Sequence, residues 1–281
     1  MTGLLLTGVL APFLLGNGLA IICAASSGVS QHSHAVIASV FAALAIPIIY
    51  WFLEGMPPFP PVASKHKLGY VLCFGGVLAI SLFAWTPAYR AVIAAIILGA
   101  SICWIGIRKL SGDDGIYFAL WFILPLVIFA AASHLNVRQS DNPYLWPVTT
   151  LIFAIAAAIV SLLGGYIGMA QMSGAFAAFI GGYLLVRYAA ELIGRGNSIP
   201  TLPNAVSWLI LFAVAAAFSS SLLFAPKLNP FAGLATLLIL LVPAYAARFQ
   251  GLPSRIQPIA MASLALVPGL IAVFVPFLPI G

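Results

Sequence analysis

The sequence predicts an all-α protein, a polytopic transmembrane helix bundle of about nine or ten spans with no soluble domain. Hydrophobic residues make up 63% of the 281-residue chain and charged residues only 6%, whereas a soluble globular domain carries roughly 25% charged residues. The apolar residues fall in runs of about 20, the length needed to cross roughly 30 Å of hydrocarbon. The connections between the runs are short, so we interpret residues 1–281 as one integral membrane domain.

Ten segments qualify, or nearly qualify, as spans. Only helices and closed barrels satisfy every backbone hydrogen bond in lipid, and runs of this length predict helices. Proline, glycine and polar residues mark the breaks between the runs, for example at 57–61, 111–115 and 136–147. The predicted helices are 3–24, 34–54, 68–88, 90–107, 115–133, 147–170, 172–194, 205–225, 229–248 and 258–279.

Two pairs of these segments are joined by very short turns, which predicts antiparallel hairpins. The turns are residues 86–90, between the third and fourth segments, and 170–173, between the sixth and seventh. Gln171 and Ser173 then lie in the second turn, where their side chains would cap helix ends. Prolines inside the apolar segments predict kinks, and these are Pro47, Pro125, Pro243 and Pro268.

The basic loops leave two interpretations of the topology open. Lys and Arg gather on the cytoplasmic side of membrane proteins, but a ten-helix map places the basic loops of the two halves on opposite sides. Either one segment between 115 and 194 does not cross the membrane, which we prefer, or halves 1–135 and 145–281 are inverted relative to each other, as in many secondary transporters. The loop residues concerned are Lys65, Lys67, Arg108 and Lys109, then Arg187, Arg195, Arg248 and Arg255.

The seventh segment carries the polar residues that stand out. Residues 174–186 are thirteen uncharged positions, too few to span, so a crossing helix includes Arg187 and Glu191. The two are four residues apart on one helix face and can form an ion pair, with Tyr183 one turn earlier. An ionisable residue at depth costs about 2.5–3.5 kcal/mol and normally faces the bundle interior. One interpretation is a substrate or proton site; the other, which we prefer, is an interfacial pair with Arg187 extending to the headgroups.

Asn17 and a set of small residues complete the candidate positions. Asn17 lies between two glycines in the first segment, and we expect it to hydrogen-bond across helices; the alternative is an unwound, ligand-binding point. Small residues let membrane helices approach closely, so we expect a tightly packed hairpin of the sixth and seventh segments. The alternative is that the two Gly-Gly-Tyr repeats, 164–166 and 181–183, break a helix or line a cavity. The small residues are Gly164, Gly168, Gly174, Ala178 and Gly182.

Sequence patterns for catalysis and cofactor binding are missing. There is no GxSxG, HExxH or P-loop pattern, and the four histidines lie in loops, where they cannot pair across helices around a haem. The three cysteines lie in apolar runs without a CxxC motif and are typical of small buried hydrophobes. We therefore predict no catalytic, cofactor-binding or metal residues and leave the cofactor open.

Two functions fit these features. The first is a small-molecule permease or exporter-like secondary transporter, indicated by the helix number, the kinks and the glycine-rich hairpin. In length and helix number the chain resembles ten-helix drug/metabolite-type permeases, a resemblance of size class that assigns no residue a role. The alternative is a non-catalytic structural or accessory subunit of a larger membrane complex, holding lipid, quinone or pigment, which the scarcity of interior charge favours.

The expected surroundings follow from the same composition. The lipid bilayer is the first partner, and other membrane subunits or a homo-oligomer are further expected partners. The net charge is +6, but the basic residues sit mostly between apolar runs, where they anchor headgroups, so we expect no nucleic acid. We expect the protein in a bacterial-type inner (cytoplasmic) membrane.

Overall fold

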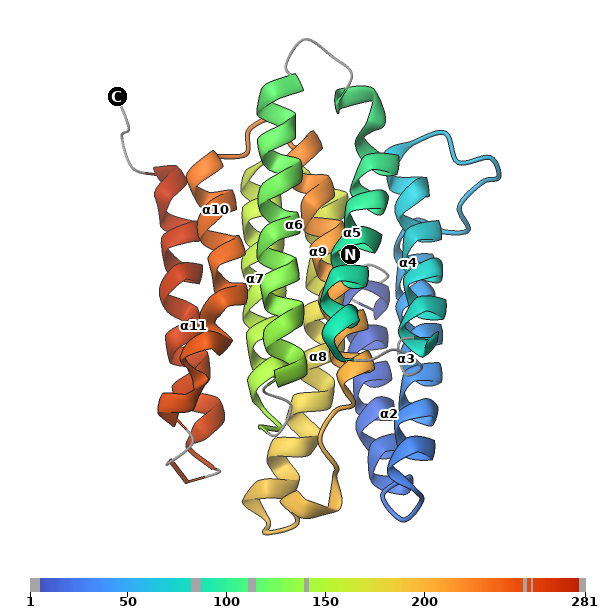
Figure 1. Ribbon diagram of the computed structural model, residues 1–281, viewed down its shortest axis with the longest axis vertical. Coiled ribbons are helices and arrows are strands. Elements are labelled where there is room, and N and C mark those ends of the chain that lie inside the picture. The colour runs from blue at the N-terminus through green and yellow to red at the C-terminus, as the bar shows by residue number, and fades with distance from the viewer. Residues whose placement is uncertain are drawn as a thin grey trace.

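The computed structural model describes residues 6–81, 87–110, 115–138, 142–249, 252–253 and 255–277. Across these residues the chain forms long helices that lie side by side in one bundle (Figure 1), and no strand occurs among them. The predicted all-α class is confirmed.

The helix boundaries agree with the predicted segments to within a few residues at most positions. In chain order the elements are η1 (Leu6–Leu10), α2 (Ala11–Ala25), α3 (Gln31–Glu54), α4 (Ser64–Ser81), α5 (Pro87–Leu110), α6 (Gly115–Arg138), α7 (Leu145–Leu163), α8 (Ile167–Leu192), η3 (Gly196–Ser198), α9 (Asn204–Phe224), α10 (Pro230–Leu238), η4 (Ile239–Phe249), α11 (Gln257–Phe274) and η5 (Val275–Phe277).

Seven helices of the described chain are long and apolar enough to cross a membrane, which makes this an integral membrane protein. Two further apolar helices are shorter, Ala119–Leu135 and Pro230–Tyr245. α4 runs beside α3, but its first turn carries Lys65, His66 and Lys67. The seven spans are Leu6–Ala25, Gln31–Glu54, Val92–Lys109, Leu145–Leu163, Ile167–Leu192, Asn204–Phe224 and Gln257–Phe277.

Helix α9 forms the centre of the bundle. All of its most apolar 18-residue window is buried inside the protein, and α3, α4, α5, α6, α7 and α8 all pack against it. A helix that is hydrophobic on every side belongs in such an interior. Aromatic rings fill the contact with α6: Trp208 stacks on Phe212 at 5.2 Å between ring centroids, and Phe129 meets both rings edge-on.

The turn between α7 and α8 differs from the prediction. It lies at residues 164–166, so Gln171 and Ser173 sit inside α8 and do not cap helix ends. Gly165 has φ of 81°, a left-handed conformation that favours glycine. The Tyr166 N–H donates to the Ser161 carbonyl and the Gly165 N–H to the Leu162 carbonyl, the pairing of a Schellman motif that ends a helix. The first Gly-Gly-Tyr repeat therefore forms the turn that separates α7 from α8.

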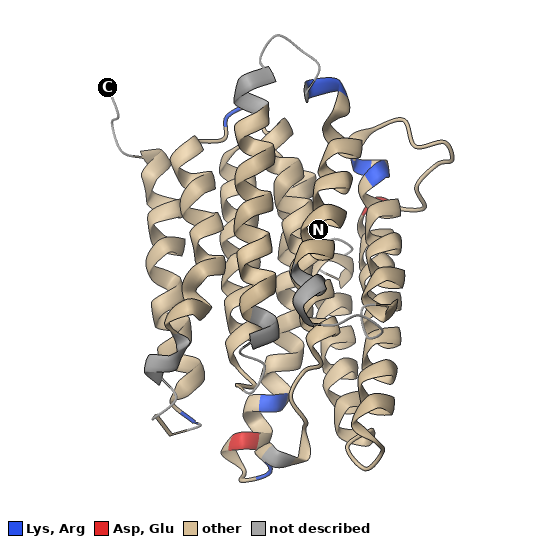
Figure 2. Ribbon diagram, in the orientation of Figure 1, with Lys and Arg blue, Asp and Glu red and all other residues tan. Residues whose placement is uncertain are grey.

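Three helices lie between residues 115 and 194, where a missing span is the preferred interpretation; α7 and α8 are among the seven spans, and the described apolar part of α6 is shorter. α6, α7 and α8 are continuous helices of 24, 19 and 26 residues, and successive helices run in opposite directions along the bundle (Figure 1). Charged residues gather toward both ends of the ribbon (Figure 2). Basic residues therefore lie at both ends of the bundle (Figure 2).

The helix contacts cross the boundary between the two predicted halves. α2 packs extensively on α8, and α9 packs on helices of both halves. In an inverted repeat, the counterpart of the α2–α8 contact is α3 against α7, and among the described residues these two make at most a marginal contact. The described helices therefore interlock as one bundle.

Candidate functional site

Helices α2 and α8 cross in direct backbone contact at two glycines. A Cβ added to Gly16 would overlap the Phe179 carbonyl, and one added to Gly182 would overlap the Phe13 carbonyl. Asn17 lies at this crossing, and its Oδ1 is buried without a hydrogen-bond partner among the described residues. The crossing brings the first helix against the segment of α8 that carries Tyr183 and Arg187.

The other small residues have different surroundings. Gly164 packs on Ala225 and Leu228 of the α9–α10 turn, and Gly168 lies beside the Glu54 carboxylate. A Cβ on Gly174 would have no neighbour within 4 Å, and Ala178 is half-buried. Of these positions, only Gly182 allows a close approach between two helices, and the helix that it approaches is α2. The expected hairpin of α7 and α8 does form, because these helices pack on each other over much of their length.

A glycine turn at the end of α8 sends the chain back toward Arg187. Gly194 has φ of 77°, and the Arg195 N–H donates to the Ala190 carbonyl at 2.7 Å, which ends α8 as Gly165 ends α7. From there the chain runs back along the bundle to the start of α9 (Figure 1). Residues 199–203 therefore lie next to the last turns of α8.

Arg187 is inside the protein, with only 5% of the residue exposed. Its Nη1 donates to the carbonyls of Ile199 and Pro200, the latter at 3.0 Å. The guanidinium carbon stands 5.3 Å from the centroid of the Tyr144 ring, within cation–π distance. The side chain thus ties the returning segment to α8, and it does not extend outward to headgroups. Its Nε is buried without a partner among the described residues.

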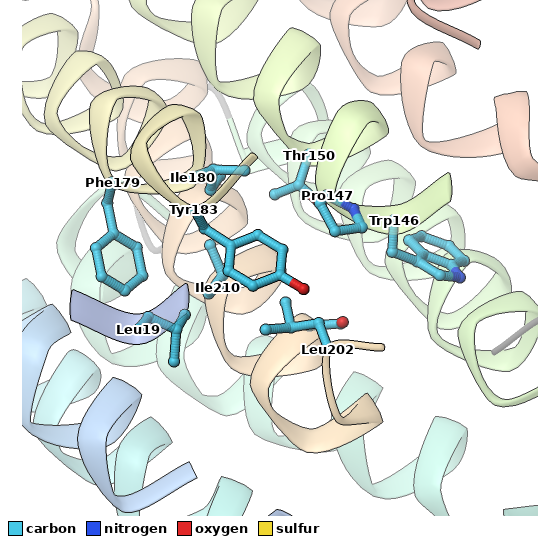
Figure 3. Close-up of a pocket in the computed structure, with 10 residues that line it drawn as sticks. Leu19, Trp146, Pro147, Thr150, Phe179, Ile180, Tyr183, Leu202 and Ile210 are labelled. Atoms are coloured by element: carbon cyan, nitrogen blue, oxygen red, sulfur yellow. The ribbon is translucent and has the colours of Figure 1, made fainter. Parts of the chain in front are cut away.

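Tyr183 lies one turn before Arg187 and borders an internal cavity (Figure 3). Tyr183 is 1% exposed, and its hydroxyl makes no hydrogen bond in the described chain, although the Arg187 guanidinium lies close to its oxygen. The hydroxyl points away from α8, toward the side on which Trp146 and Leu202 lie. The cavity has room for about one water molecule. Its other lining residues are Leu19, Pro147, Thr150, Phe179, Ile180, Ser207 and Ile210.

A second, more polar cavity of similar size lies beside the first, toward one end of the bundle. Asn142, Pro143, Thr201 and Asn204 line its outer part. Trp146, Pro147, Leu202 and Ser207 line both cavities. The Asn142 side-chain Nδ2 donates to the Gln257 Oε1 at 3.2 Å, and its Oδ1 accepts from the Tyr144 N–H at 3.0 Å. The two cavities therefore adjoin each other between α7 and α9, and Tyr183 borders the inner one.

The charges around these cavities come mainly from Arg187. Its positive charge acts on the Tyr183 hydroxyl and on the Cys23 thiol of α2. Burial raises the pKa of the Tyr144 phenol at the start of α7, and the Arg187 charge partly offsets this rise, so Tyr144 is neutral near pH 7. Glu191 lies one turn further along α8, with its carboxylate against Gly196. The inner cavity therefore borders the Tyr183 hydroxyl, and the buried cation Arg187 lies next to that hydroxyl without lining the cavity.

Sequence reasoning found Arg187, Tyr183, Glu191 and Asn17 but missed the α7 side of this site. The sequence predicts no functional role for Tyr144 and Trp146, yet both are buried, at 1% and 3% exposed. The prolines at 143, 147, 200 and 203 were the available signal, because they mark irregular backbone near a helix end. No cluster of three or more His, Cys, Asp or Glu that could hold a metal occurs in the described part of the chain.

Comparison with protein-family models, characterised proteins and solved structures gives no match to this chain. Its function is therefore argued from the site alone.

Proposed function

We propose that the protein is a small-molecule permease whose solute binds beside Tyr183 and Arg187. One observation carries the proposal: two adjoining cavities, the outer one lined by the amide side chains of Asn142 and Asn204, lie between one end of the bundle and a buried tyrosine hydroxyl that makes no hydrogen bond in the described chain. Buried polar groups are nearly always hydrogen-bonded, and an exception calls for an explanation. A solute group that accepts from Tyr183 supplies one. Ionisable residues inside membrane bundles mark such solute pathways.

The chemistry of the site favours a small organic anion with an apolar body. Arg187 provides the positive charge and Tyr183 a hydroxyl donor, and hydrogen bonds to a charged acceptor are roughly twice as strong as neutral ones. Phe179, Ile180 and Ile210 give the inner cavity apolar walls. A carboxylate on a short aliphatic or aromatic body matches both properties.

Transport requires a path through these cavities to open and to close. The inner cavity has room for about one water, so a solute could enter only after the cavity widens. The residues that separate α7 from α9 at its mouth are the short, proline-containing segments at 142–147 and 199–203. Movement of these segments would admit a solute from one end, and rocking of helices around a central site is the general mode of secondary transporters.

Binding and uptake of defined carboxylates test the proposal. Purified protein is first screened by thermal unfolding against acetate, lactate and benzoate, with acetamide, lactamide and benzamide as neutral counterparts. We expect at least one carboxylate, and not its amide, to raise the unfolding temperature, and the same radiolabelled anion to enter proteoliposomes. Tyr183→Phe should reduce both effects, whereas Tyr188→Phe, whose hydroxyl bonds the Arg255 carbonyl outside the path, should leave both unchanged.

The alternative function gives a different set of results. If the protein purifies in mild detergent with stoichiometric membrane partners, and no solute enters proteoliposomes, it is a subunit of a larger complex. A monomer or homodimer that moves solute supports the permease.

A further inference from the structure

An apolar groove runs along the outer face of the bundle between α3 and α4. The two helices touch on their inner sides, where a Cβ on Gly69 would overlap the Tyr50 ring and one on Gly76 would meet Ala43 at 3.1 Å. The groove is open outside this contact because small side chains form its floor. Its volume is about 460 Å³. The floor and walls include Ala43, Leu44, Pro47, Cys73, Val77 and Met56.

The groove faces the hydrocarbon of the membrane. α3 is one of the seven apolar spans, and the wall residues Leu44, Val77 and Met56 are 61%, 65% and 70% exposed. The groove follows α3 from Val40 to Trp51, a length of roughly 16 Å at 1.5 Å per residue. This is about half of the 30 Å hydrocarbon core, or one leaflet. A single acyl chain of one leaflet therefore matches the length and the chemistry of the groove.

Basic residues lie beyond one end of the groove. The groove ends near Met56 and Pro57, and α4 begins after them with Lys65 and Lys67. The Lys67 Nζ donates to the Trp104 carbonyl of α5 at 2.8 Å, which brings this end next to the last turn of α5. That turn carries two more basic residues, Arg108 and Lys109.

Positive charge exceeds negative charge at this end. Lys65 forms a salt bridge to Glu54 at 2.9 Å and keeps 48% of its side chain exposed. Among the described residues of α3, α4 and α5 at this end, four are basic and one, Glu54, is acidic, and basic clusters attract anionic lipid headgroups.

We propose that this groove holds one acyl chain of an anionic phospholipid, whose phosphate lies among Lys65, Lys67, Arg108 and Lys109. The groove length fixes the leaflet, and the basic cluster selects the headgroup. The groove is on the opposite flank of the bundle from α11 (Figure 1) and shares no lining residue with the two cavities near Tyr183. The lipid site is therefore independent of the proposed transport.

Native mass spectrometry of the reconstituted protein tests this proposal. The full chain is reconstituted into vesicles with equal mole fractions of phosphatidylglycerol and phosphatidylcholine, extracted in mild detergent, and its bound lipids are counted by mass. We expect phosphatidylglycerol to be retained at a several-fold excess over phosphatidylcholine. Lys65→Gln with Lys67→Gln should lower this ratio several-fold. Arg255→Gln, at the opposite end of the bundle, should not change it.

Filling the groove gives the second test. Cys73→Phe places a ring on the groove floor and should remove most of the retained phosphatidylglycerol. Leu266→Phe is the control, because Leu266 is 42% exposed on α11, outside the groove, and about as far along its helix. Equal retention of the two lipids by the wild type, or full retention by Cys73→Phe, overturns the proposal. A neutral quinone recovered in place of phospholipid from native membranes also overturns it. If Cys73→Phe does not fold, the lipid ratio and the double-lysine variant decide.

Discussion

Replacing Tyr183 by Phe should stabilise the solute-free protein, which is unusual for a buried tyrosine. The Tyr183 side chain is 1% exposed, and its hydroxyl makes no hydrogen bond in the described chain. Leaving a buried donor unsatisfied costs about 1–3 kcal/mol. Phe keeps the ring and its packing but removes this cost. We therefore expect the free energy of unfolding to rise by about 1–3 kcal/mol.

The matched control is Tyr50→Phe. Tyr50 is equally buried, at 2% exposed, but its hydroxyl donates to the Lys65 carbonyl at 3.0 Å. Removing this hydroxyl loses a formed bond, so the free energy of unfolding should fall by about 0.5–1.5 kcal/mol. Both variants are measured by reversible SDS-induced unfolding in mixed micelles, followed by tryptophan fluorescence. If Tyr183→Phe is destabilised as Tyr50→Phe is, the Tyr183 hydroxyl is bonded in the native protein and offers no free donor to a solute.

The remaining predictions concern the crossing, the buried cation and the topology. Gly182→Ala should destabilise the protein by at least about 1–3 kcal/mol, because its Cβ overlaps the α2 backbone; Gly174→Ala, with open space, should be neutral or slightly stabilising in the same unfolding assay. Arg187→Gln should cost about 1–3 kcal/mol or more, because it leaves the Ile199 and Pro200 carbonyls without their donor; Arg187→Lys should recover part of this loss. Glu191→Gln should abolish uptake of the carboxylate identified by the binding screen while the protein stays folded, and unchanged uptake would remove Glu191 from the site. Single cysteines at His66 and Arg195 should react with membrane-impermeant maleimide from opposite sides, and reaction from one side would show that one segment between 115 and 194 does not cross the membrane.

The helices could be predicted from the sequence, but their arrangement could not. Lipid-facing and protein-facing residues are both apolar in a membrane bundle, so nothing in the composition marked α9 as the central helix. The α7–α8 turn was placed at Gln171 and Ser173 because they are polar. The chain turns at Gly165 instead, where the glycine takes a left-handed conformation and Schellman hydrogen bonds end α7.

The polar residues of α8 in the site could be predicted from the sequence, but the residues that pack around them could not. Arg187 and Tyr183 stand out because charge and hydroxyl groups are rare in long apolar segments. Tyr144 and Trp146 come from the start of α7, which packs on α8, and Leu202 comes from the segment before α9. The return of residues 199–203 along α8 brings that second segment to Arg187. The sequence shows prolines next to these residues, but it does not indicate which of the segments lie together in space.

The water path to Tyr183 is the central claim, and the reactivity of a cysteine at Ser207 tests it most directly. Ser207 lines both cavities and is 8% exposed, while Ser221 on the same helix is fully buried and bonded to Ser161 at 2.7 Å. With Cys23, Cys73 and Cys103 replaced by Ala, Ser207→Cys should react in membranes with small methanethiosulfonates from the Arg195 side. The anionic sulfonatoethyl reagent should react faster than the cationic trimethylammonium one, because Arg187 is near. Reactivity no greater than that of Ser221→Cys would contradict a path from the end of the bundle to Tyr183.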